Sequence, residues 1–125
     1  MNCNIPLSIA EELTHRYHYS AETGEGAADA IVKFFNPAGA QTWYISEGCP
    51  LDWNGEPCEI DAAEDWHLFG FCDLGMAGCA ELGYVLLSQL QAVRVGPFGI
   101  EIERDIHFKP TPLAEIQDNY RRACA

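Results

Sequence analysis

Apolar and polar residues alternate most regularly near the end of the chain, over residues 100–108. Successive side chains of a strand point to opposite faces, so this pattern predicts a strand with one apolar and one polar face. Two runs rich in strand-forming residues, 31–35 and 41–46, flank the turn sequence Asn36-Pro37-Ala38-Gly39 and are predicted to form a β-hairpin. Two further strands are predicted at residues 66–72 and 82–86, in largely apolar segments.

Helical signals occur at three places along the chain. Ser8-x-x-Glu11 is a capping-box sequence that opens a first helix, and Ser88-x-x-Gln91 opens a short second one. Thr111-Pro112 predicts the start of a third helix, with proline at the first helical position. Residues 20–29 and 47–65 are predicted loops. The order α-β-β-β-β-α-β-α predicts one α+β domain over residues 1–125, with a mainly antiparallel sheet of about five strands and two to three helices on one side.

The charge balance narrows the classes of partner. The 125-residue chain carries 19 Asp and Glu against 7 Lys and Arg, which gives a formal net charge of −12. The phosphates of nucleic acids repel such a protein, so direct binding of DNA or RNA is disfavoured. A basic protein, a metal ion or a cationic ligand suits this field better.

The chain shows no signal for secretion or for membrane insertion. Its first residues lack a cationic start followed by a long apolar run, and no stretch approaches the roughly 20 apolar residues of a membrane helix. We therefore expect a soluble cytoplasmic protein without a membrane partner. In a reducing compartment the six cysteines are expected to be free thiols, and their spacing lacks the close cysteine pair of most zinc sites.

The acidic loop at 47–65 is the first candidate site. Loops of this length in a compact domain are usually functional or disordered. Trp53 lies between Asp52 and Asn54, and an aromatic side chain beside acids is typical of a protein-binding patch or a cationic-ligand pocket. The predicted partner-binding residues are Asp52, Trp53, Glu56 and Arg104.

The polar face of the predicted strand at 100–108 is the second candidate. Its alternate positions hold three carboxylates and an imidazole, ligand types that suit Mg2+ or Mn2+, and such a site would activate water for attack on a phosphoester. These residues are Glu101, Glu103, Asp105 and His107. Neighbouring positions on one face lie about 6.6–7 Å apart, so a solvated outer face is the simpler explanation. Arg104 interrupts the apolar face, which indicates an ion pair or a partner contact.

Five groups of short motifs follow one another along the chain. They are Lys33-Phe34-Phe35-Asn36-Pro37, Thr42-Trp43-Tyr44-Ile45, Leu68-Phe69-Gly70-Phe71, Glu81-Leu82-Gly83-Tyr84-Val85 with Leu87-Ser88-Gln89-Leu90, and Ile102-Glu103-Arg104-Asp105. In this order and spacing they resemble the domain-of-unknown-function family DUF2958, over roughly residues 5–116. The resemblance implies a small bacterial protein with an accessory role, carried on plasmids, integrative elements or defence islands. It supplies no catalytic residues.

Three functional hypotheses stay open at this point. The leading one is a non-catalytic accessory protein that binds or regulates another protein, for instance a basic DNA-handling protein, through an acidic surface. The alternative is a divalent-metal-dependent enzyme that acts on nucleic acid or nucleotides through the acidic strand. No Gly-x-Ser-x-Gly or His-Glu-x-x-His motif accompanies it in the sequence. A third hypothesis is a small-ligand binder with a pocket between sheet and helices.

Overall fold

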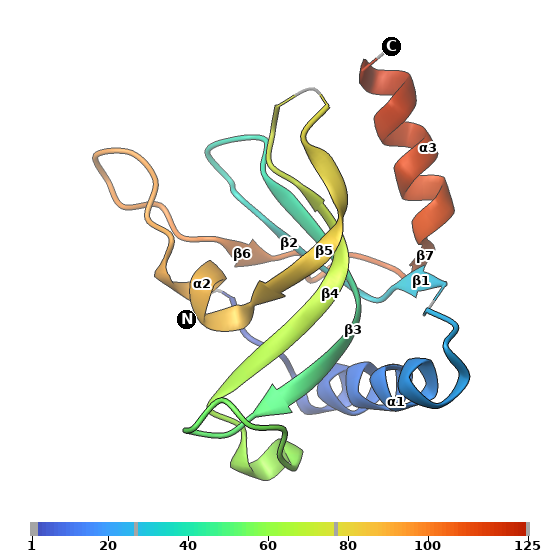
Figure 1. Cartoon of the computed structure of the whole chain (residues 1–125). Coiled ribbons are helices and arrows are strands. Elements are labelled where there is room, and N and C mark those ends of the chain that lie inside the picture. The colour runs from blue at the N-terminus through green and yellow to red at the C-terminus, as the bar shows by residue number, and fades with distance from the viewer. Residues whose placement is uncertain (1–2, 27, 77, 125) are drawn as a thin grey trace.

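A five-stranded antiparallel sheet organises the molecule (Figure 1). The computed structural model describes residues 3–26, 28–76 and 78–124. The strands of this sheet are β2 (Val32–Phe35), β3 (Thr42–Leu51), β4 (Asp65–Asp73), β5 (Ala80–Leu86) and β6 (Glu103–Arg104), in the spatial order β5-β4-β3-β2-β6. The helices are α1 (Leu7–Thr23), α2 (Leu87–Ala92) and α3 (Leu113–Cys124), with a short 3-10 helix, η1, at Ile60–Ala62. Two short strands, β1 (Asp29–Ala30) and β7 (Thr111–Pro112), pair antiparallel in a second sheet.

The two faces of the large sheet carry separate hydrophobic cores. Alternation along β3 places Trp43 and Ile45 in one core and Tyr44 beside the other. The larger core lies on the Trp43 side and is covered by α1 and α2. The smaller core joins Phe71 of β4 to Leu113 of α3. The expectation of helices on one side is therefore wrong, because both faces of the β3–β4 pair are apolar and each needs a cover.

The predicted α+β class and element order are confirmed. Without the two-residue strands β1 and β7, the elements follow the order α-β-β-β-β-α-β-α. The hairpin predicted at 31–35 and 41–46 is formed by β2 and β3. However, β3 continues to Leu51, because an irregularity between Ile45 and Glu47 lets it keep pairing with β4 as far as Asp65. The loop predicted at 47–65 is shorter for this reason and contains η1.

The prediction of a strand at residues 100–108 is wrong for most of this segment. Only the two residues of β6 form a strand, and the chain turns directly after them. The side chain of Asp105 accepts the backbone N–H of His107 (2.9 Å), and the backbone N–H of Phe108 donates to the carbonyl of Asp105 (3.2 Å). Asp side chains stabilise turns in this way, at the expense of strand pairing. Ile106, which the alternation assigns to the apolar face, is 70% exposed.

The N-terminal ends of the helices differ from the predicted ones. α1 has no side-chain hydrogen bond at its N-cap, and it extends into the loop predicted at 20–29. At α2 the carboxylate of Asp65 at the start of β4 accepts the backbone N–H of Ser88 (2.9 Å), and the side chain of Gln89 accepts that of Leu86 (2.9 Å). Thr111-Pro112 does not begin α3 but pairs with β1, and the helix follows directly after it.

Candidate functional site

The connection from β3 to β4 presents one tryptophan to solvent. The backbone N–H of Asp52 donates to the carbonyl of Glu56 (2.8 Å), and its carboxylate oxygen Oδ1 accepts the backbone N–H groups of Asn54 (2.8 Å) and Glu56 (3.0 Å). Gly55 adopts φ of +78° in this turn, a conformation that glycine reaches without steric cost. Trp53 in the turn is 85% exposed. Asp52 therefore holds the turn that exposes Trp53.

Acidic side chains share the β3–β4 connection with this tryptophan. Glu56, Glu59 and Asp61 are all exposed on the same connection. Leu7 and Glu11 of α1 line a depression of the surface together with residues 59–61. We call this surface the acidic end, and it consists of Leu7, Glu11, Asp52, Trp53, Glu56, Glu59, Ile60 and Asp61. It combines apolar side chains with five carboxylates.

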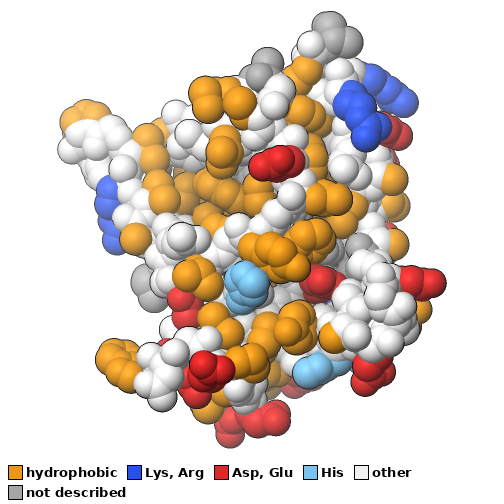
Figure 2. All heavy atoms as spheres, viewed as in Figure 1, with side chains coloured by type: hydrophobic (Ala, Val, Ile, Leu, Met, Phe, Trp, Pro, Cys, Tyr) orange, Lys and Arg blue, Asp and Glu red, His pale blue; other side chains and the backbone are white. Residues whose placement is uncertain are grey.

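No Lys or Arg of the surrounding sequence balances these acids. Residues 34–93 contain nine Asp and Glu but no Lys or Arg, and residues 1–15 contain no Lys or Arg either. The ion pairs formed by the described residues are Arg16–Glu12, Lys33–Asp105, Arg94–Glu101 and Arg121–Asp118, and none of them includes a residue of the acidic end. Figure 2 shows acidic side chains along the lower edge, where Figure 1 places α1 and the β3–β4 connection. The acidic end thus carries an uncompensated negative charge.

Two polar contacts hold α1 against β3 and so assemble the acidic end. Glu47 of β3 is only 7% exposed and accepts a hydrogen bond from the hydroxyl of Ser20 in α1. Cys49 of β3 is also buried, and Tyr17 of α1 lies close enough to its thiol to affect the pKa of Cys49. Burial raises the pKa of the Cys49 thiol, and the neighbouring hydroxyl of Tyr17 offsets only part of this rise. A thiol with a raised pKa stays protonated at neutral pH, so this contact is structural rather than nucleophilic.

A known family matches the chain along nearly its whole length. The family is described as a protein of unknown function (DUF2958), and its sequence profile covers residues 5–123. The chain belongs to DUF2958. The resemblance found in the sequence motifs is thereby confirmed, whereas no curated protein and no solved structure matches this DUF2958 protein. In the part of the chain that the structure describes, no helix has the length and apolar character needed to cross a membrane.

The second candidate site of this DUF2958 protein does not gather its predicted ligands. Glu101 and Asp105 each contact a basic side chain, at 3.6 and 3.8 Å. Glu103 lies in β6, whereas His107 lies beyond the turn that ends this strand. The alternation that would place all four on one face is therefore absent. Within residues 3–26, 28–76 and 78–124, no three His, Cys, Asp or Glu side chains are grouped to hold a metal ion. The Mg2+ or Mn2+ hypothesis has lost the strand geometry on which it was based.

Arg104 lies apart from the other three predicted partner-binding residues. It stands opposite Phe34 across the β2–β6 pair, and its Nε atom is buried without a hydrogen-bond partner among the residues that the structure describes. Phe34 in turn stands opposite Trp43, nine residues before Asp52, which is a span of about 30 Å along an extended chain. The structure therefore joins Asp52, Trp53 and Glu56 in one surface but not Arg104.

Leu7 and Glu11 belong to the acidic end although the sequence does not point to them. They lie far from Trp53 along the chain, and only the packing of α1 beside β3 brings them near the β3–β4 connection. One signal for this arrangement exists in the sequence. The helical segment before Arg16 contains acids but no Lys or Arg, as does the acidic connection itself.

Proposed function

We propose that this DUF2958 protein is a non-catalytic module that binds a basic segment of another protein at its acidic end. The observation that carries this proposal is Trp53, 85% exposed in a hydrogen-bonded turn and flanked by carboxylates. An exposed tryptophan leaves a large apolar area in water, and a partner that covers this area gains the free energy of its burial. The turn is held by the protein itself, so little ordering entropy is lost on binding.

Two kinds of contact favour a basic partner. Tryptophan is enriched among the residues that contribute most to binding at protein interfaces. The carboxylates of the acidic end attract Lys and Arg, and they repel acidic surfaces and nucleic acid. The depression beside Leu7 and Ile60 provides an apolar lining for the aliphatic part of a Lys or Arg side chain, with carboxylates within reach of its charged group.

The test uses synthetic peptides in which Arg or Lys alternates with apolar residues. Trp43 and Trp66 are buried, so acrylamide quenching of tryptophan fluorescence in the free protein reports mainly on Trp53. We expect peptide binding to protect Trp53 from quenching. Calorimetry then measures the affinity for the Trp53→Ala variant, which is expected to bind at least about tenfold more weakly because an interface anchor is lost.

Two charge variants distinguish peptide binding at the acidic end from a general attraction by the net charge of the protein. The triple variant Glu56→Gln, Glu59→Gln, Asp61→Asn is expected to weaken peptide binding at least about tenfold, because it removes three carboxylates of the acidic end. The control removes three exposed acids elsewhere on the surface, with the substitutions Glu22→Gln, Glu81→Gln and Glu115→Gln. Equal losses in the two variants would show that bulk charge attracts the peptide and would refute the proposal. Unchanged binding in the Trp53→Ala variant would refute it as well.

A further inference from the structure

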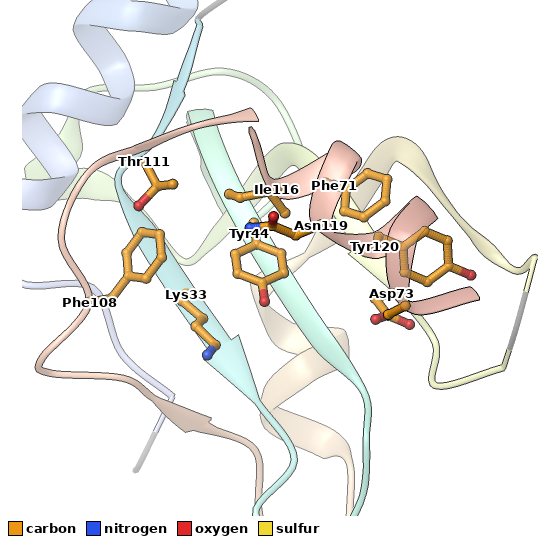
Figure 3. A pocket seen from close by; sticks show the side chains of 10 residues that line it. Lys33, Tyr44, Phe71, Asp73, Phe108, Thr111, Ile116, Asn119 and Tyr120 are labelled. Atoms are coloured by element: carbon orange, nitrogen blue, oxygen red, sulfur yellow. The ribbon is translucent and has the colours of Figure 1, made fainter. Parts of the chain in front are cut away.

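A cavity of about 420 Å³ lies between α3 and the large sheet (Figure 3). Its floor is a row of cross-strand neighbours, since the register places Lys33 opposite Tyr44 and Tyr44 opposite Phe71. Asp73 follows on the same face of β4, and Tyr120 of α3 closes the opposite wall. The volume falls in the range of about 300–1,000 Å³ that small-molecule sites occupy.

Aromatic rings from four segments form the walls of this cavity. The ring centroids of Tyr44 and Phe108 are 6.1 Å apart, and those of Phe71 and Tyr120 are 5.6 Å apart with an angle of 69° between the ring planes. The hydroxyl of Tyr120 donates to the carbonyl of Met76 (3.1 Å), which ties α3 to the β4–β5 connection. The faces of aromatic rings are electron-rich and attract cations.

Lys33 illustrates how these walls hold a cation. Its Nζ atom lies 5.6 Å from the centroid of the Tyr44 ring and 3.8 Å from a carboxylate oxygen of Asp105. The charge of Lys33 is thus matched within the protein. A ring face combined with a carboxylate already binds one ammonium group of the chain at the edge of the cavity.

Asp73 adds a negative charge that is not matched in this way. Among the ion pairs that the described residues form, none includes Asp73. Its Oδ1 atom accepts the backbone N–H of Gly75 (2.9 Å). The pKa of Tyr44 is raised by burial and, beyond that, by the carboxylates of Asp73 and Asp105, so both acids act on the phenol in the middle of the cavity floor. The cavity therefore has a net negative field.

We propose that this cavity binds a small organic cation, whose ammonium or guanidinium group contacts the carboxylate of Asp73 and packs against the surrounding aromatic rings. An anionic ligand is disfavoured, because Asp73 and Asp105 outnumber Lys33 and the whole chain carries a net charge of −12. Asn119 of α3 also lines the cavity and offers an amide group to a polar substituent of the ligand. This inference does not rest on the proposed function, since the acidic end lies at the far end of β3.

A free small molecule and a side chain of another protein are two sources of such a cation. Choline represents the first source and the amide of N-acetyl-trimethyllysine represents the second. The tert-butyl analogue of choline, in which carbon replaces the ammonium nitrogen, has the same shape without the charge. Inorganic phosphate serves as the anionic probe.

The test is a titration followed by the aromatic resonances of the protein in NMR spectra. We expect at least one cation to shift the ring signals of Tyr44, Phe71 and Tyr120 saturably, and the neutral analogue to bind at least about fivefold more weakly. Tighter binding of choline or of the lysine derivative identifies the source, and either result supports the proposal. Equal affinity for the neutral analogue, saturable phosphate binding at the same rings, or no saturable shift with either cation overturns it.

Three variants test the assigned charges. Asp73→Asn keeps the oxygen that accepts the N–H of Gly75, and it is expected to weaken cation binding at least about fivefold because it removes the charge. Glu115→Gln removes an exposed acid of α3 outside the cavity and is expected to leave binding unchanged. Lys33→Gln removes the cation that already lies over the Tyr44 ring, so choline is expected to bind more tightly. Full affinity in Asp73→Asn, or a loss in Lys33→Gln, overturns the proposal, with thermal unfolding used to verify that each variant is folded.

Discussion

The six cysteines of the chain are all free, yet their environments differ widely. Cys3 is 2% exposed and lies in the larger core, whereas Cys79 and Cys124 are exposed at the surface. Burial raises the pKa of Cys3 to about 12, and burial followed by the nearby carboxylate of Glu81 raises that of Cys72 to about 11. Only the thiolate form of cysteine is a nucleophile, so a raised pKa lowers the reactivity of the thiol.

This difference predicts the order in which the thiols react with a disulfide reagent at pH 8. Cys79 and Cys124 are expected to react fast because they are accessible. Cys3 is expected to react only as the protein unfolds, since with a pKa near 12 only about one thiol in ten thousand is ionised at this pH. Mass spectrometry of partly labelled protein identifies the sites. Rapid labelling of Cys3 in the folded protein would contradict the burial described here, and the double variant Cys79→Ser, Cys124→Ser serves as control.

At the scale of elements, the β3–β4 pair depends on one close backbone approach. A Cβ atom at Gly70 of β4 would lie 1.8 Å from the carbonyl oxygen of Tyr44 and 2.8 Å from Cα of Ile45. Gly70 stands opposite Ile45, directly before the irregularity in β3. Its partner on the other side is Gly83 of β5, where an added Cβ meets no atom within 4 Å. The missing side chain at Gly70 thus lets the sheet bend at this point.

Two alanine substitutions test this requirement. Gly70→Ala is expected to lower the free energy of unfolding by at least about 3 kcal/mol, because backbone atoms of β3 have to move to admit the methyl group. Gly83→Ala is the matched control, at the opposite position of the same ladder, and is expected to change stability by less than about 1 kcal/mol. Urea unfolding followed by circular dichroism measures both values. Similar values for the two variants would show that the close approach at Gly70 is not required.

The elements that local signals determine are predicted well from the sequence. Strand-forming residues on both sides of Asn36-Pro37-Ala38-Gly39 are sufficient to place the β2–β3 hairpin. The length of β3 is not predicted from the sequence, because it depends on pairing with β4 beyond the irregularity at Ile45. Alternation at 100–108 fails as a guide, because the side chain of Asp105 captures the backbone of His107 and starts a turn. Hydrophobic periodicity predicts neither the extension of β3 nor the turn that follows β6.

In the candidate site, too, some residues are identified by local sequence signals and others only by the packing of distant elements. Local composition marks Asp52 and Trp53 as parts of an acidic, aromatic connection, and Trp53 is exposed in the structure. Leu7 joins the acidic end through the packing of α1 beside β3, which no short sequence pattern specifies. Arg104 is predicted to bind the partner together with these residues but does not lie beside them. Its place in a predicted strand gives no information about its distance from the acidic end.

At the scale of the whole molecule, charge is distributed unevenly. The acidic end has five carboxylates in a region without Lys or Arg. Basic side chains lie toward other parts of the surface, among them Arg121 and Arg122 in the last turn of α3. A high net charge destabilises a compact state through repulsion between like charges, and salt reduces this repulsion.

Added salt is therefore expected to stabilise the protein. Raising the ionic strength from about 0.01 M to about 0.15 M shortens the Debye length from about 30 Å to about 8 Å. We expect a gain of about 1 kcal/mol in the free energy of unfolding, seen in calorimetry as a rise of roughly 3–5 °C in Tm. The triple variant Glu56→Gln, Glu59→Gln, Asp61→Asn is expected to respond less to salt. A fall in Tm with added sodium chloride would contradict this account of the acidic end.

The separation of the two hydrophobic cores also affects how the molecule opens. α3 is attached through the smaller core, which contains Phe71, Leu113 and Ile116, whereas α1 and α2 share the larger core on the other face of the sheet. Proteins open in cooperative units, and a helix with few buried contacts detaches at a lower free energy than the rest. Subglobal unfolding of α3 would remove Ile116 and Tyr120 from the walls of the 420 Å³ cavity while the larger core stays closed. Binding in this cavity thus depends on the local stability of the C-terminal helix as well as on the global stability of the fold.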